Sequence, residues 1–237
     1  MGDTASHFVW DMVGFWILIF YTDTFGISAA AAGTIMLIAR FWDMISDPIM
    51  GIIADRTKTR WGKFRPYILW MALPYSILAV LTFSTPNLSQ SGKVIYAGVT
   101  YFLLMTVYTA INLPYSSLGA VMTSDSNERA GLNSYRFIFA FVGQFIVTGT
   151  ALSLALYFGK GDNAKGYQYT LILFAAISFI LFLITFASTK ERVQPPKEQK
   201  ESLKEDFKNL FKNKPWMILL FVGIISFIMF AMQNLAI

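Results

Sequence analysis

The sequence has no cysteine, few charged side chains and a single histidine. Without cysteine the chain can form neither disulfides nor thiolate metal sites, and the redox state of its compartment stays undecided. Only 14% of the 237 residues are charged, whereas a soluble domain carries about a quarter. Hydrophobic residues make up 55%, and the mean hydropathy is +0.52. The composition predicts a membrane protein, so the net charge of +5 does not indicate a nucleic-acid-binding surface.

Long apolar runs fill most of the chain. A helix that spans a membrane needs about 20 predominantly apolar residues. Seven segments fit this length, namely residues 5–27, 29–53, 66–85, 93–119, 131–158, 167–188 and 215–237. Basic residues gather between the second and third segments and between the sixth and seventh. The positive-inside rule therefore predicts that the N-terminus and these two connections are cytoplasmic.

The spacing of the segments predicts three parts in an all-α transmembrane protein. Residues 1–188 would form a six-helix bundle, 189–214 a cytoplasmic linker with an amphipathic helix, and 215–237 a seventh spanning helix. Six spans, a charged linker and one further span is how the first half of a twelve-helix transporter joins its second half. We therefore expect a fragment of such a transporter, with the C-terminal bundle missing.

The second span carries ionisable side chains where few are tolerated. Arg40, Asp43 and Asp47 lie within two helical turns, and each costs roughly 2.5 to 3.5 kcal/mol to insert. The two carboxylates share one helix face, so they can jointly bind a small cation such as Na⁺ or H₃O⁺. The alternative is an inert Arg40–Asp43 ion pair with Asp47 capping the helix before Pro48.

A further acid lies on the first span. Asp11 shares a helix face with His7, and at membrane depth it should point into the bundle. A carboxylate facing a polar cavity can accept hydrogen bonds from two sugar hydroxyls. The alternative is that Asp11 only forms an ion pair with Arg136 of the fifth span.

The fourth span contains the polar sequence YTAINLPYSSLG. Tyr108, Asn112 and Tyr115 lie on one face of the predicted helix, and Thr109 places a hydroxyl beside it. Tyrosine rings that stack on a sugar and an amide that binds its hydroxyls would form a substrate site. Packing within the bundle is the alternative role for Tyr115.

The connection DRTKTRWGKFRP follows the second span. We expect its charged side chains to bridge neighbouring helix ends and to control the conformational equilibrium without touching substrate. These residues are Asp55, Arg56, Arg60 and Arg65. Pro66 fits the first turn of the third span.

Several of these stretches together resemble one family. MGDTASH, FYTDTFGIS, RFWDMISDPIMGIIADRTKTRWGKFRPY and YTAINLPY are similar to the glycoside, pentoside and hexuronide cation symporters, the group that includes melibiose permease. The resemblance covers the chain but only the N-terminal half of a family member. It implies a major facilitator fold, a multi-pass protein of the bacterial cytoplasmic membrane, and a start slightly upstream of Met1.

The resemblance also implies roles for individual residues. The cation-site aspartates of the family correspond to Asp43 and Asp47, which would bind Na⁺ in a sodium-coupled protein. The accompanying residues correspond to Arg40, Tyr108, Thr109 and Arg136, and of these Thr109 is expected in the cation site. His7 and Asn112 stand where melibiose permease has sugar-binding aspartates, so galactoside specificity does not transfer, and Asp11 is expected to take the role on the first span.

We therefore predict a secondary active transporter, not an enzyme, that carries a sugar or glycoside together with Na⁺ or H⁺. Its partners would be that sugar, a monovalent cation, membrane lipid and the missing bundle, with no nucleic acid and no resident cofactor. One alternative is a Mg²⁺-dependent lipid transferase, because Asp-x-x-x-Asp also binds the metal of diphosphate substrates. The other is a non-transporting remnant of a symporter.

Overall fold

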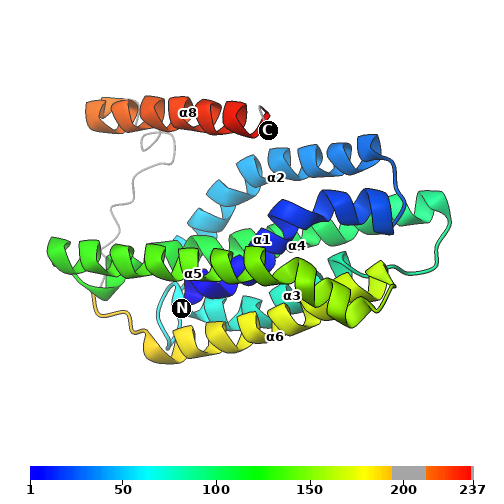
Figure 1. The fold of residues 1–237 in the computed structure, drawn as a ribbon. Coiled ribbons are helices and arrows are strands. Elements are labelled where there is room, and N and C mark those ends of the chain that lie inside the picture. The colour runs from blue at the N-terminus through cyan, green and yellow to red at the C-terminus, as the bar shows by residue number, and fades with distance from the viewer. Residues whose placement is uncertain (194–211, 236–237) are drawn as a thin grey trace. The chain divides into compact units, whose positions relative to one another are not determined.

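The computed structural model describes residues 1–193 and 212–235. Contacts within the chain divide it into two units, residues 1–194 and 195–237. The first unit contains α1 (Gly2–Ile19), the π-helical turn η1 (Phe20–Thr24), α2 (Ala29–Arg56), α3 (Arg65–Thr82), α4 (Gln90–Met122), α5 (Ser126–Gly159) and α6 (Asn163–Ser188) (Figure 1). The second contains α8 (Lys214–Leu235). The all-helical architecture predicted from the apolar runs is confirmed, whereas η1 was not expected.

Five of these elements are long and apolar enough to cross a membrane: residues 2–24, 29–56, 90–122, 126–159 and 163–188. The shorter α3 is not among the five; it begins with Arg65 and Pro66 and contains Pro74. In α8 the apolar stretch is Lys214–Gly223. The amphipathic helix expected in the linker lies in residues 194–211, outside the described residues, so the boundaries of the three predicted parts stay a prediction.

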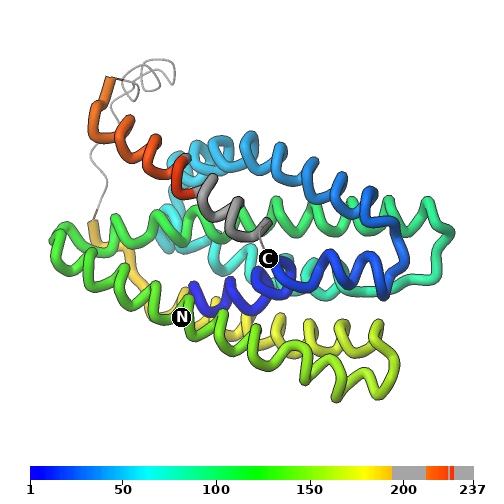
Figure 2. Tube along the Cα trace, turned by 45° about the horizontal axis from the view of Figure 1, so that its top comes forward, coloured from blue at the N-terminus to red at the C-terminus, as the bar shows by residue number. Residues whose placement is uncertain are grey.

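Helix α1 lies inside the first unit. It packs against α5 and α6, while α3 packs against α4 and α6, and α2 packs against α4 (Figures 1 and 2). Hydroxyls join the helices at several crossings. Thr4 Oγ1 donates to the carbonyl of Phe139 on α5 at 2.7 Å, and Ser178 Oγ of α6 donates to the carbonyl of Ala5 at 2.7 Å. These bonds fix the start of α1, where the cavity described below opens.

Small residues bring the backbones close together. A Cβ on Gly143 of α5 would lie 2.9 Å from the Cβ of His7, and one on Gly166 of α6 would lie 2.2 Å from the carbonyl oxygen of Ala155. Such contacts let membrane helices pack by van der Waals attraction, because lipid provides no hydrophobic drive between them.

Side-chain caps mark where four helices begin. Ser28, Ser89, Asp125 and Asp162 each accept a hydrogen bond from a backbone N–H in the first turn that follows. At Asp162 the backbone N–H of Lys165 is the main cause that lowers the pKa of the exposed carboxyl from its usual value. Pro66 lies in the first turn of α3, as predicted.

Of the five segments long and apolar enough to span a membrane, α2 and α5 bury the least of their surface. Only 17% of the apolar window of each is buried, compared with 61% for the first span. Large apolar side chains cover the outer face of both, and Met44 and Phe145 are 72% and 79% exposed. These faces are suited to lipid or to another apolar helix.

Candidate functional site

A cavity of about 530 Å³ opens between the first half of α1, the second half of α4 and the first half of α5. Its volume lies within the range of small-molecule sites, roughly 300 to 1,000 Å³. Polar side chains on all three helices face it, with an apolar wall on α5. The lining residues are Asp3, Ser6, His7, Tyr108, Asn112, Ser116, Asn133, Arg136, Phe137, Ala140, Phe141 and Gln144.

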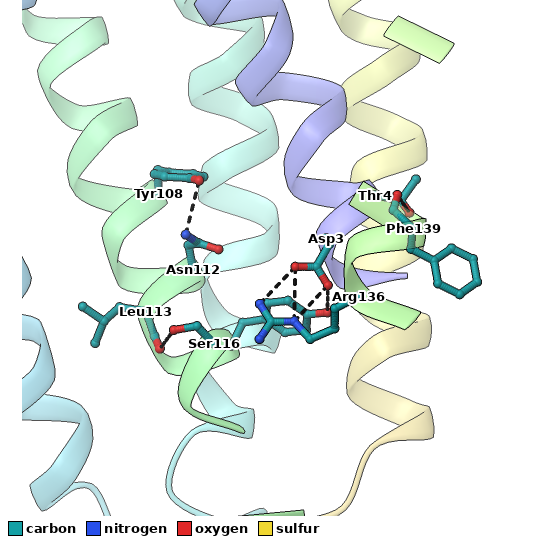
Figure 3. A network of polar contacts seen from close by, with 9 residues as sticks. Asp3, Thr4, Tyr108, Asn112, Leu113, Ser116, Arg136 and Phe139 are labelled. Carbon is teal, nitrogen blue, oxygen red and sulfur yellow. Dashed lines mark hydrogen bonds and ion pairs between the residues drawn. The ribbon is translucent and has the colours of Figure 1, made fainter. Parts of the chain in front are cut away.

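An ion pair lies in the cavity wall between α1 and α5 (Figure 3). Arg136 Nε and Nη2 donate to the two oxygens of Asp3 at 3.1 and 3.0 Å. Tyr115 Oη of α4 donates to Asp3 Oδ2 at 2.5 Å, and the guanidinium lies 4.7 Å from the centre of the Tyr115 ring. Three helices thus meet at one carboxylate. Tyr115 lines a neighbouring space and acts here as a hydrogen-bond donor.

Sequence reasoning missed Asp3. The available signal was charge balance, because Arg136 at membrane depth needs an acidic partner and Asp3 is an acid near the same end of the bundle. The alternative that paired Asp11 with Arg136 is wrong. Asp11 is buried, and both of its oxygens accept from His7 Nδ1, at 2.9 and 3.1 Å. Asp11 therefore contacts the cavity through His7, which lines it, and is not itself a lining residue.

The predicted polar face of α4 borders the cavity. Asn112 Nδ2 donates to Tyr108 Oη at 3.2 Å, and both side chains line the space (Figure 3). The Tyr108 ring stacks on Trp10 of α1, with the ring centres 4.3 Å apart and the planes at 15°. One face of this ring is therefore occupied by protein, while Tyr108 also lines the cavity.

An acidic side chain of α2 contacts Thr109 of α4, the residue that directly follows Tyr108. Thr109, which is buried, donates from Oγ1 to Asp47 Oδ1 at 2.9 Å. One oxygen of Asp43 is 3.6 Å from an Arg40 nitrogen, whereas Oδ1 is buried and has no hydrogen-bond partner in the described part of the chain. Helix α2 continues through Pro48 to Arg56, so the alternative in which Asp47 caps a helix end is wrong.

Contacts between side chains connect the α2 acids with the cavity. Arg40 lies 5.6 Å from the centre of the Trp10 ring, and Trp10 stacks on Tyr108. Thr109 of the acid cluster directly follows Tyr108 of the cavity. A hydrogen bond thus links Asp47 to the α4 residue that directly follows the cavity residue Tyr108.

The connection after α2 differs from the prediction in its partners. Asp55 forms its ion pair with Lys63 at 2.9 Å, within the same connection, and not with the arginines. Arg56 and Arg60 are exposed, and Arg60 lies over the Trp61 ring. The expectation that these residues bridge helix ends holds for Arg65, where one guanidinium nitrogen donates to the carbonyl of Phe186 on α6 at 2.7 Å.

Glu191 is a second residue that sequence reasoning missed. Its carboxylate accepts from the backbone N–H groups of Lys63, Phe64 and Arg65, at 2.8, 2.7 and 3.0 Å. It thereby satisfies the free amides at the start of α3, and a Cβ on Gly62 would lie 2.4 Å from Glu191 Cδ. The backbone partners of a distant carboxylate leave no pattern in the sequence.

Comparison with known proteins gives consistent results. The family of MFS/sugar transport proteins matches residues 1–237. The chain is 43% identical to the inner membrane symporter YicJ and 44% identical to the putative glycoside/cation symporter YagG, both of Escherichia coli K12. It is 40% identical to the isoprimeverose transporter of Lactiplantibacillus pentosus. These matches cover 95%, 92% and 95% of the chain, and 48% of each relative, so the chain spans about half the length of the curated relatives it matches.

Proposed function

Because the chain belongs to the MFS/sugar transport family, and within it to the glycoside, pentoside and hexuronide cation symporters, we propose that it takes part in cation-coupled transport of a sugar or glycoside. The cation would be Na⁺ or H⁺, and the membrane the bacterial cytoplasmic membrane with the N-terminus inside. The exposed apolar faces of α2 and α5 are suited to a second bundle that completes the transport path.

The observation that carries this proposal is the hydrogen bond between Asp47 and Thr109, one residue from the cavity. A small cation bound between Asp43 and Asp47 would neutralise their mutual repulsion, and it would supply a partner for the orphaned Asp43 Oδ1. A hydroxyl oxygen such as that of Thr109 is a suitable further ligand for Na⁺.

The cavity supplies the substrate side of the proposal. Amide, hydroxyl and carboxylate groups on three helices surround a space of suitable volume, as a polyol substrate requires. Cation binding would fix α2 against α4 through Thr109 and so position Tyr108 and Asn112 for the sugar. Linkage requires the sugar to raise cation affinity by the same factor.

The magnesium-dependent transferase has less support. Its metal site needs additional acids near the Asp-x-x-x-Asp pair, and within the described ranges no group of three or more His, Asp or Glu is placed to hold a metal ion. The relatives are named as transporters. We therefore favour symport.

Isothermal titration of the protein, expressed from its complete reading frame, tests the proposal. A panel of α- and β-glycosides is titrated with and without Na⁺ and at several pH values, in wild type, Asp43→Asn, Asp47→Asn and the control Asp23→Asn, which changes an exposed acid in η1. Cation-dependent binding that both α2 variants lose and the control keeps is the expected result. Binding that ignores the cation and both aspartates would contradict symport at this site.

A further inference from the structure

The charges around the cavity are compensated within the protein. Among the described residues that line it, only Asp3, Arg136 and His7 are acidic or basic residues, of the types Asp, Glu, Lys, Arg and His. Asp3 and Arg136 form an ion pair, and His7 is paired with the buried Asp11. The remaining polar lining groups are neutral amides and hydroxyls. A ligand would therefore meet many neutral hydrogen-bonding groups and, among the described lining residues, no cation without an acidic partner.

The Arg136 guanidinium is the group that would otherwise recognise an acidic sugar. Guanidinium and carboxylate planes form bidentate pairs, which are among the stronger and more specific polar contacts in proteins. In this structure Asp3 already occupies Nε and Nη2. Tyr115 Oη of α4 donates a further hydrogen bond to the same carboxylate, so Asp3 is held from a third helix.

We propose that Asp3 makes this site selective for uncharged glycosides over glycosides of uronic acids, by occupying Arg136. The inference rests on the proposed function, because it names the substrate class of the same cavity. A uronate entering the site must either displace Asp3 from the guanidinium or place its own carboxylate beside that of Asp3 without a cationic partner, and like charges in close contact disfavour binding. A neutral sugar avoids this charge repulsion and can form hydrogen bonds with both partners of the pair, because both line the cavity.

Replacing Asp3 by asparagine tests the assignment. The amide keeps the shape and can still contact Arg136 and Tyr115, but the negative charge is gone. The probes are pairs that differ only in the C6 carboxylate: p-nitrophenyl glucosides against glucuronides and galactosides against galacturonides, in both anomers. Affinities are measured on the complete protein in lipid nanodiscs at saturating cation, together with thermal unfolding to verify folding.

Wild type should bind the neutral member of a pair at least ~10-fold more tightly than the acidic one. Asp3→Asn should raise the affinity for the acidic member relative to that for the neutral member by roughly 10- to 100-fold, as expected for a newly available bidentate arginine. Asp3→Asn combined with Arg136→Gln should lose this gain, because the guanidinium is absent. Asp23→Asn, which removes an exposed acid from η1 outside the cavity, is the matched control and should behave as wild type.

Two outcomes would overturn the assignment and leave symport standing. Wild type could bind uronides as tightly as neutral glycosides, or Asp3→Asn could weaken both members equally, which is the result for an ion pair that only holds α1 against α5. An absence of cation-dependent binding for every pair would instead overturn the proposed function, and the inference with it. If Asp3→Asn does not fold, the acidic-to-neutral affinity ratio of wild type decides alone.

Discussion

Replacing Thr109 by valine would remove the hydroxyl that donates to Asp47 and leave the shape of the side chain nearly unchanged. The hydrogen bond is 2.9 Å long, Thr109 is buried, and Asp47 lies on the exposed side of α2. The substitution therefore tests one contact between the α2 acids and α4, while both aspartates and the ion pair of Arg40 and Asp43 remain.

The size of the effect follows from the chemistry of the bond. A hydrogen bond to a charged group contributes about 1.5 to 3 kcal/mol, and the exposure of Asp47 favours the lower end of that range. About 1.4 kcal/mol corresponds to a tenfold change in a binding constant. We therefore expect the Na⁺ concentration that gives half-maximal enhancement of glycoside affinity to rise about tenfold.

The assay is titration of glycoside at a series of Na⁺ concentrations. If glycoside binding to wild type depends on pH and not on Na⁺, the pH at which glycoside affinity is half-maximally enhanced is compared instead. A displacement of that pH by about one unit corresponds to the same free energy as a tenfold change in Na⁺ concentration. Thr148→Val is the matched control, because that exposed hydroxyl only donates to the carbonyl groups of its own helix, α5. An unchanged midpoint in Thr109→Val, with a lowered affinity at saturation, would refute the role of this contact in cation binding.

Three further substitutions test the packing and the loop contacts. Gly62→Ala should lower the free energy of unfolding more than Gly161→Ala. Both glycines have positive φ, 112° and 98°, but of the two only Gly62 would bring a new Cβ against a neighbour. Chemical denaturation measures the difference, and equal losses of stability would argue against the contact with Glu191. Glu191→Gln should speed hydrogen exchange of the three loop amides by about tenfold, because a charged acceptor is lost; unchanged protection would show that the amides do not depend on it. Gly166→Ala should destabilise by about 1 to 3 kcal/mol through a clash with the backbone of α5, whereas Gly149→Ala, which meets open space, should be neutral; similar melting temperatures would contradict the close approach.

Much of the fold could be predicted because apolar length and charge placement are local properties of the sequence. The seven predicted spans coincide with helices to within a few residues, and Ser28, Pro66 and Asp162 mark starts that capping rules explain. The positions of Asp43 and Asp47 on one helix also followed from spacing, since α2 is continuous through both.

The partners of the charged side chains could not be predicted in the same way. Asp11 and Arg136 looked like a pair because both were buried charges, but helix packing brings Asp3 to Arg136 and leaves Asp11 with His7 four residues before it. Spacing defines the face of one helix, not the rotation and depth of a second helix against it. The roles proposed for these residues in binding stay predictions until the titrations are made.

The contact of Glu191 with the start of α3 also sets an order of events during synthesis. The carboxylate follows its first amide partner, at Lys63, by 128 residues. At about 5 to 20 residues per second, a ribosome would need roughly 6 to 26 seconds to add that length. Throughout this interval the start of α3 would lack its carboxylate partner, and the connection between α2 and α3 could take its final form only after α6 had been made. The segment that follows α6 would thus complete a loop translated much earlier.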